Sequence, residues 1–326
     1  MWRIVVLQSD KDVLHIQKHI MDTGGVDGRV GSSVRSLYTT FQWTKHPQAI
    51  LQLAASCANL LRLDAPIVSL TLPATSRPIL LAPGRNLRTL TLFGDTSRSD
   101  WEFDMRDLVG LKTLQHLTVV SRVVVPAQCP HPLFSLLTLV WQARLQVEAV
   151  RWLLQNSSGS LQVLMLRAPK LDFLNECLCR HGPSLLSLRL HLGGSIGRGL
   201  FPELVETIRE QCPRLRELLC DVDLGSASLT GLPPTIQHLA VNPRQKTNMF
   251  RDGGFHNWAD SLPSLTKLTL WGCHARHLFQ LQATVTDPWR LWEVFRPELQ
   301  IELARPEVFT VGWPFVSDRY GSCVDA

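Results

Sequence analysis

The sequence is poor in charge and has no long apolar run. Only 19 % of its 326 residues are charged, and its net charge of +5 comes from side chains scattered along the chain. Nucleic-acid binding requires Lys and Arg gathered into a patch or stripe. A membrane-spanning helix requires about 20 consecutive apolar residues. We therefore expect no nucleic-acid partner and no membrane span.

The eight cysteines show no spacing typical of a zinc site or a disulfide framework. None of them forms a C-x-x-C pair, which is the spacing that structural zinc sites use. The first residues, MWRIVVLQSDKD, hold an apolar run from Ile4 to Leu7 followed at once by acidic residues. That run is too short for a secretory signal. We predict an intracellular protein, cytoplasmic or nuclear, with reduced and mostly buried cysteines.

No established catalytic motif is present, and three segments only partly match one. Gly193–Gly199 reads GGSIGRG, but it lacks the GK[ST] ending and the GxGxxG spacing of phosphate-binding loops. The segments CLCRH (Cys177–His181) and GCHARH (Gly272–His277) hold metal-ligand residue types without paired spacing. We expect an enlarged turn at the first segment, and buried thiols with surface histidines at the others.

Cys177 and Cys179 should point to different faces of a helix. These readings predict no catalytic residue, no cofactor and no metal. A nucleotide- or metal-dependent enzyme that uses the Gly193–Gly199 loop or a Cys/His cluster remains an alternative hypothesis.

One six-residue pattern recurs along most of the chain. It consists of an aliphatic residue, two variable residues, a second aliphatic, one variable residue and a third aliphatic. The clearest copies are LRTLTL (87–92), LQVLML (161–166), LLSLRL (185–190) and LTKLTL (265–270). From Leu87 onward the first positions lie about 21 to 30 residues apart, close to the period of leucine-rich repeats.

Between these hexads the apolar spacing is that of a helix. The best example is Leu204, Ile208 and Cys212, and the segments that begin at Val147 and Leu171 show the same spacing. One strand and one helix cannot bury both apolar faces alone, but stacked copies can. The sequence therefore predicts an α/β fold: a right-handed leucine-rich-repeat solenoid with a curved parallel sheet on its concave side and helices on its convex side.

An ordinary α/β core is the alternative to this fold, but a doubly wound sheet does not reproduce one spacing so often. We place the solenoid at residues 1–283. From residue 284 aromatic residues and prolines concentrate around one further strand candidate at 298–304. Terminal repeats have to close an open core, so we predict an aromatic-rich C-terminal cap at 284–326.

Residues 1–59 read as atypical repeats. They offer a strand at 3–7, a helix that Asp10 or Asp12 can cap, and a glycine-rich loop at 24–33. A second helix begins at Pro47. Two overlapping hexad registers follow, one through Leu60 and Leu63 and one through Ile67, Leu70 and Leu72, and the sequence does not decide between them.

Three segments resemble the leucine-rich repeats of F-box proteins, particularly the divergent fungal set. They are CANLLRL at Cys57, CPRLREL at Cys212 and LPSLTKLTLWGC at Leu262. The resemblance implies a substrate-recognition subunit of a cullin-type ubiquitin ligase, in which an F-box binds the ligase adaptor. The first sixty residues contain no F-box pattern, so we expect the adaptor as a partner only if an F-box is missing from this chain.

Residues that alternate with the leucines of each strand should face the concave wall. Charged residues, histidines and a tryptophan at these positions are typical of a protein-binding surface. The predicted partner-binding residues are Arg167, Arg189, His191, Glu217, Asp221, His238, Lys267 and Trp271. We therefore predict a non-enzymatic scaffold that binds a protein partner on its concave face. A decayed paralogue without a partner is a further alternative, and Trp271 either anchors a ligand or supports the closing repeat.

Overall fold

A computed structural model of the chain describes eleven stretches. They are residues 4–27, 32–39, 47–66, 86–93, 103–120, 123–125, 128–192, 201–220, 231–241, 261–271 and 300–304. The chain divides into two compact units, residues 1–185 and 186–326. Both units have the predicted α/β architecture of a leucine-rich-repeat solenoid, in which each hexad supplies one strand of a parallel sheet.

The first unit is built on a parallel sheet whose strands follow one another in chain order. These strands are β1 (Ile4–Leu7), β2 (Ser36–Thr39), β3 (Arg62–Pro66), β4 (Thr89–Phe93), β6 (His116–Val119), β8 (Thr138–Trp141) and β9 (Val163–Arg167). Two short strands, β5 (Phe103–Asp104) and β7 (Val123–Val124), form a separate parallel pair. We did not predict this pair, because two residues are too few to show a periodicity.

The second unit repeats the arrangement with five parallel strands, again in chain order. They are β10 (Ser187–His191), β11 (Glu217–Cys220), β12 (His238–Val241), β13 (Lys267–Trp271) and β14 (Gln300–Ala304). The register aligns the second leucine of each hexad, so that Leu188, Leu218, Leu239 and Leu268 lie side by side. β14 confirms the strand predicted within 298–304.

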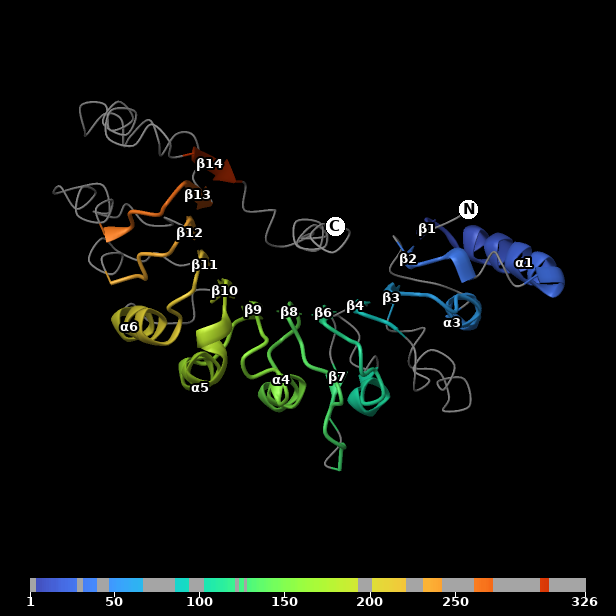
Figure 1. Cartoon of the computed structure of the whole chain (residues 1–326), viewed down its shortest axis with the longest axis horizontal. Coiled ribbons are helices and arrows are strands. Elements are labelled where there is room, and N and C mark those ends of the chain that lie inside the picture. Colours follow the sequence, from blue (N-terminus) through green and yellow to red (C-terminus); the bar gives the residue numbers. More distant parts are fainter. Residues whose placement is uncertain are drawn as a thin grey trace. The chain divides into compact units, whose positions relative to one another are not determined.

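Helices join many of the strands, as the change of periodicity predicted. They are α1 (Asp10–Asp27), α3 (Pro47–Ser56), α4 (Val147–Leu154), α5 (Leu171–His181) and α6 (Phe201–Gln211), together with the 3-10 helices η3 (Met105–Leu108) and η4 (Gly182–Ser184). In the first unit α3, α4 and α5 lie on one side of the sheet, and in the second unit α6 does the same (Figure 1).

The core of each unit lies between its sheet and its helices. Leu164 in the first unit and Leu188 in the second are completely buried. Leu204 and Ile208 on α6 are also buried, as is Cys212 directly after the helix. Each such side chain contributes roughly 1.5–3 kcal/mol of burial free energy. The aliphatic positions of the hexads are therefore the main source of stability within each unit.

The helix α1 is present as predicted, but both of its ends differ from the prediction. The helix begins at Asp10, so its N-cap residue is Ser9, and neither Asp10 nor Asp12 takes the predicted cap position. The Asp12 side chain instead accepts hydrogen bonds from the backbone N–H groups of Gln8 and Ser9, both at 2.9 Å, while its own N–H donates to the Ser9 hydroxyl at 3.4 Å, as in a capping box.

The helix continues to Asp27, so the predicted loop is wrong for Gly24–Asp27. A glycine weakens a helix by about 1 kcal/mol, and a helix that is already formed can extend through it because each added residue gains a hydrogen bond.

The structure chooses one of the two registers that the sequence left open. β3 belongs to the register in which Leu60 and Leu63 are buried. The other register, from Ile67 to Leu72, lies outside the described residues, as do 272–299 and 305–326. The boundary of the solenoid at residue 283 and the C-terminal cap therefore stay predictions.

Candidate functional site

The strand face of the second unit, the sheet face opposite the buried leucines, carries two rows of aligned side chains. Cross-strand register places Ser187, Glu217, His238 and Lys267 next to one another in the first row. The second row consists of Arg189, Leu219, Ala240 and Thr269. These rows follow directly from the hexad pattern, because residues two apart on a strand point to the same face.

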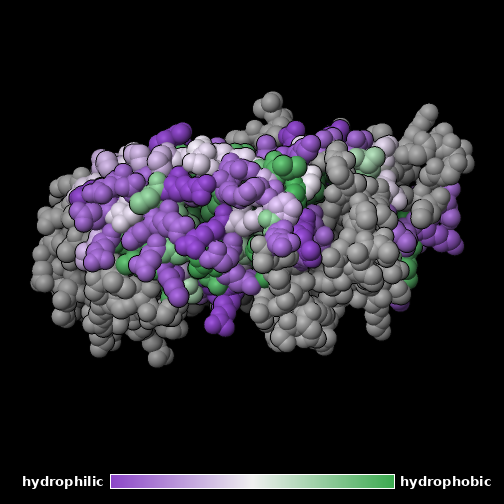
Figure 2. Space-filling view, turned by 90° about the horizontal axis from the view of Figure 1, so that it is seen from below, coloured by the Kyte–Doolittle hydropathy of each residue, from purple (hydrophilic) through white to green (hydrophobic). Residues whose placement is uncertain are grey.

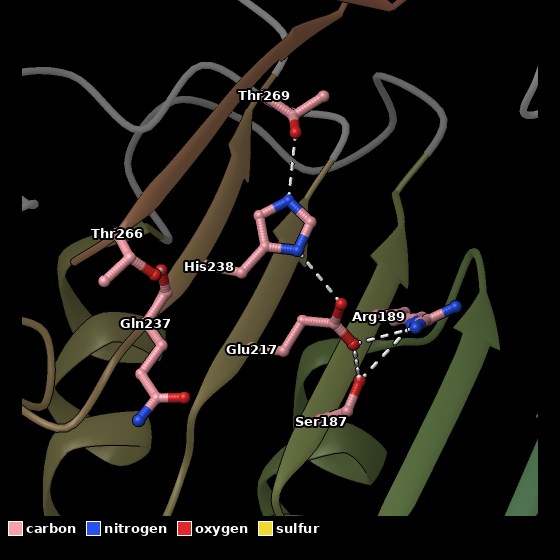
Figure 3. Close-up of polar contacts among 7 residues, drawn as sticks. All are labelled: Ser187, Arg189, Glu217, Gln237, His238, Thr266 and Thr269. Atoms are coloured by element: carbon pink, nitrogen blue, oxygen red, sulfur yellow. Dashed lines mark hydrogen bonds and ion pairs between the residues drawn. The ribbon is translucent and has the colours of Figure 1, made fainter. Parts of the chain in front are cut away.

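A carboxylate lies at the centre of the polar groups on this face. The Oε2 atom of Glu217 accepts a hydrogen bond from Nη2 of Arg189 at 2.8 Å and another from the hydroxyl of Ser187 (Figure 3). Nε of Arg189 also donates to the Ser187 hydroxyl at 3.2 Å. Glu217 thus receives an ion pair and a hydrogen bond from the neighbouring strand β10.

The other carboxylate oxygen reaches the opposite neighbour, β12. Nδ1 of His238 lies 3.0 Å from Oε1 of Glu217, and Nε2 lies 2.9 Å from the hydroxyl of Thr269 on β13 (Figure 3). A carboxylate only accepts hydrogen bonds, so Nδ1 carries a proton and donates it. We call Ser187, Arg189, Glu217, His238 and Thr269 the Glu217 network; it joins four successive strands.

The network is largely shielded from water. Residue Arg189 is 7 % exposed and Thr269 is 4 % exposed. Burial by itself would raise the pKa of the Glu217 carboxyl. The hydrogen bond from His238, the charge of Arg189 and the hydrogen bonds from Ser187 and Arg189 outweigh burial and lower that pKa to about 2. Glu217 is therefore ionised at neutral pH and balances the charge of Arg189.

The series carboxylate, imidazole and hydroxyl has the connectivity of a hydrolase triad, but its surroundings do not suit acyl transfer. Thr269 is buried, and Glu217 is already paired with Arg189. Acyl transfer also needs preorganised hydrogen-bond donors that stabilise an oxyanion. The backbone of β13, the strand that carries Thr269, is instead hydrogen-bonded to β12 on one side and to β14 on the other. Within the described strands the arrangement fixes the positions of its own polar groups.

The structure brings together part of the set predicted from the sequence. Arg189, Glu217 and His238 belong to the Glu217 network, and Lys267 is the register neighbour of His238. His191 ends β10 and is partly exposed, and Trp271 is the last residue of β13. Asp221 lies outside the described residues. Arg167 belongs to the first unit, where it ends β9, is exposed, and donates a hydrogen bond to the Gln142 carbonyl at 3.3 Å.

Two members of the network, Ser187 and Thr269, were not among the predicted site residues. The alternation of the hexads does place both on the strand face, so their orientation was available from the sequence. Their role was not, because a hydroxyl becomes part of a network only when a neighbouring strand supplies its partner. Both hydroxyls are bonded here to residues 30 or 31 positions away in the chain.

A polar cluster on the strand face of the first unit was not predicted from the sequence. Arg62 pairs with Asp64 at 3.3 Å, and its guanidinium carbon lies 4.6 Å from the centre of the Tyr38 ring. Nδ1 of His116 lies 3.0 Å from the hydroxyl of Thr138. Burial lowers the pKa of His116, and the charge of Arg62 lowers it further. The sequence Gln-His-Leu occurs in both groups of residues, at 115–117 in the first unit and at 237–239 in the second. This repeat is the sequence signal from which the cluster could have been predicted.

The cysteine and histidine segments form no metal site among the described residues. Cys177 is buried and Cys179 is exposed, so the two point to different faces of α5 as predicted, but the expectation of buried thiols is wrong for Cys179. Burial raises the pKa of Cys177 to about 12. His181 is only 2 % exposed, so the expectation of a surface histidine is wrong. It ends α5 and turns inward, where Nδ1 lies 3.4 Å from the Ser157 carbonyl. Gly193–Gly199 and the segment from Gly272 to His277 lie outside the described residues.

The helix side of the molecule has a different character. Seen from the side on which α4 and α5 lie in Figure 1, the described surface is mainly hydrophilic, with hydrophobic residues in small areas (Figure 2). Its polar contacts include the exposed pairs of Arg151 with Glu148 and with Glu176. Exposed pairs of this kind contribute little to stability.

No described helix has the length and apolar content that crossing a bilayer requires.

Comparison with solved structures gives a likeness at low sequence identity. No protein-family model matches the chain, and no curated protein sequence matches it. A crystal structure of the complex of Rad7 and Elc1 in yeast is similar over 90 % of this chain and 88 % of the matched chain, with 13 % sequence identity and a TM-score of 0.39.

Proposed function

We propose that this chain is a non-enzymatic scaffold that binds a protein partner through the strand face of its second unit. The observation that supports this proposal is the Glu217 network, in which four neighbouring strands hold polar side chains in one fixed arrangement. Groups that are already ordered lose less conformational entropy when a partner binds. A repeat sheet whose polar groups are held in this way is well suited to recognition through the partly exposed side chains at the margin of the network.

The network also divides the predicted residues by role. Arg189 and Glu217 neutralise one another and are mostly buried, so they hold the surface in shape. Lys267 and His191 are partly exposed at the margin of the network, where a partner can contact them. Replacing Arg189 would disturb the surface as well as remove a contact. Lys267 and His191 are therefore the better residues to replace in a binding test.

A pull-down with matched variants tests the assignment of the face. Lys267→Glu combined with His191→Ala alters the strand face, and Arg209→Glu alters the exposed side of α6 in the same unit, where the Arg209 side chain is 52 % exposed. We expect recovery of the partner to fall about tenfold or more for the strand-face variant and to be unchanged for the helix variant. Circular dichroism and thermal unfolding verify that both variants are folded.

Equal recovery by the two variants would rule out the strand face of the second unit as the binding surface. Loss of recovery with the helix variant alone would move the binding surface to the helix side.

We further infer, from the repeat resemblance, that the partner is a substrate presented to a cullin-type ubiquitin ligase. In support, Cys57, Cys212 and Leu262 are all completely buried just before β3, β11 and β13, as that repeat pattern requires. Co-purification of a ligase adaptor with the product of the full-length transcript tests this role. If the adaptor is absent while the strand-face partner is retained, the ligase role fails and the scaffold proposal stands.

A further inference from the structure

One side of α1 carries exposed cations around a leucine. Residues three, four and seven positions apart share one side of a helix, and on α1 this side holds Lys11, Leu14, His15 and Lys18. All four are exposed, and Leu14 is 43 % exposed. On the opposite side Val13 is completely buried, and α1 packs against α3 (Figure 1). We call the four exposed residues the α1 face.

The two lysines of the α1 face have no partner within the protein. In the part of the chain that the structure describes, the ammonium groups of Lys11 and Lys18 form neither a hydrogen bond nor an ion pair. Asp12 is occupied with backbone N–H groups that precede the helix. Asp22 is exposed one turn beyond Lys18, but an acid four residues after a lysine is in the less favourable orientation for a pair. The surface is thus positive from Lys11 to Lys18, and Asp22 ends it.

Two exposed arginines on later helices show a different arrangement. Arg151 on α4 pairs with Glu148 at 2.8 Å and also with Glu176 on α5. Arg209 on α6 pairs with Glu206 at 3.3 Å. The charges of these arginines are neutralised within the protein, whereas the lysines of the α1 face are available to an anion from outside.

We propose that the α1 face binds an acidic helical segment of a protein partner, in which two carboxylates flank an apolar side chain. Lys11 and Lys18 are seven residues apart, which is about 10 Å along the helix axis, and Leu14 lies between them. Two glutamates seven residues apart on a partner helix have the same separation and also share one side. Each glutamate can then meet one lysine, and an apolar residue between them can cover Leu14.

The composition of the α1 face favours a protein segment over a membrane or a nucleic acid. A helix that lies in a membrane surface inserts a broad apolar side, but the apolar side of α1 is directed inward, where Val13 is buried. A phosphate backbone is bound by many cations, whereas the α1 face has two lysines and one histidine. Two separated charges with one aliphatic side chain between them fit a short acidic segment of a protein.

Fluorescence anisotropy of two labelled synthetic peptides with the full chain tests this proposal. The first peptide is an alanine-based helix with two glutamates seven residues apart and a leucine midway, and the second has glutamines in place of the glutamates. We expect the chain to bind the glutamate peptide about fivefold more tightly than the glutamine peptide. Raising the NaCl concentration from about 0.05 to about 0.5 M should reduce this difference, because salt screens exposed charges.

Variants of the chain locate the binding surface. Lys11→Glu combined with Lys18→Glu should weaken binding of the glutamate peptide about tenfold or more, because attraction becomes repulsion. Leu14→Ser should weaken binding of both peptides about threefold, since both share the leucine contact. Arg88→Glu combined with Lys112→Glu is the matched control: both side chains are exposed in the first unit and the net charge changes equally. The control should bind the glutamate peptide as tightly as the wild type.

Equal binding of the two peptides by the wild type would overturn the proposal, and so would a lysine variant that binds as tightly as its matched control. Vesicles of phosphatidylcholine with phosphatidylserine provide a different source of negative charge. Binding to these vesicles without binding to the glutamate peptide would assign the α1 face to a membrane surface and overturn the protein partner. All the substitutions replace exposed side chains, and circular dichroism verifies that the variants are folded.

Discussion

Two hexads, one in each unit, have nearly the same sequence but place their histidines in different environments. LQHLTV (114–119) contains His116, and IQHLAV (236–241) contains His238. The leucine that follows each histidine is completely buried. On the preceding strand, however, His116 faces Thr89, whereas His238 faces Glu217. His238 therefore gains a carboxylate partner, and His116 is left beside the charge of Arg62.

The charged pairs of the two units differ in the same way. Arg62 pairs with Asp64 on its own strand, whereas Arg189 pairs with Glu217 on the next strand. A pair within one strand stabilises that repeat alone, while a pair between strands also stabilises the contact between repeats. The hexad determines which face of the sheet a side chain points to, and the neighbouring repeat determines which polar groups it contacts. The following variants test that conclusion.

Replacing Glu217 by Gln should have the largest effect. The substitution keeps the shape but leaves Arg189 buried without its counter-charge, and we expect the free energy of unfolding to fall by about 3 kcal/mol. Urea unfolding of the full chain measures this change. Glu206→Gln on α6 is the control: that side chain is 62 % exposed, so its replacement should change stability by less than about 0.5 kcal/mol. Equal effects of the two substitutions would contradict a structural role for the network.

Lowering the pH should gradually remove the stability that the Glu217 carboxylate contributes. The pKa of Glu217 is about 2 in the folded chain against an ordinary value of 4.5, so the unfolded state binds more protons between these values. The stability that Glu217 supplies is complete above pH 4.5 and is lost as the pH falls toward 2. By pH 3 we expect the gap between the wild type and Glu217→Gln to narrow by about 2 kcal/mol. A gap that stays constant from pH 6 to pH 3 would contradict the lowered pKa.

Giving the first unit the missing carboxylate should produce a smaller change. Thr89→Glu places an acid opposite His116, in the position that Glu217 has relative to His238. We expect the pKa of His116, which burial and Arg62 hold below its ordinary value, to rise by about one unit. An NMR titration of the imidazole measures it. Thr89→Gln is the uncharged control, and a rise of the same size in that variant would show that charge is not the cause.

Much of the fold could be predicted from the sequence because burial repeats with the hexad. The aliphatic positions at Leu164, Leu188 and Leu239 gave the strands, their inward faces and the parallel order. The small β5 and β7 pair, the length of α1 past Gly24 and the inward turn of His181 were not predictable. Each of these features occurs once and does not recur with the hexad, so no period reveals it.

The candidate site could be predicted only in outline. Alternation placed Arg189, Glu217 and His238 on the strand face, and the structure joins them through Ser187 and Thr269. Most of the bonds that join them cross between strands whose residues are about 20 to 30 positions apart, and a single sequence does not state which residues of two such strands lie opposite one another. For the same reason the polar cluster around Arg62 was missed.

By itself the sequence determined the repeat, the direction of its side chains and the absence of the tested catalytic motifs, because the hydrophobic pattern is a local property that the backbone of a strand turns into two faces. Only the tertiary structure decided which polar groups meet. Two similar hexads hold histidines of different character because stacking sets a glutamate beside one and a threonine beside the other.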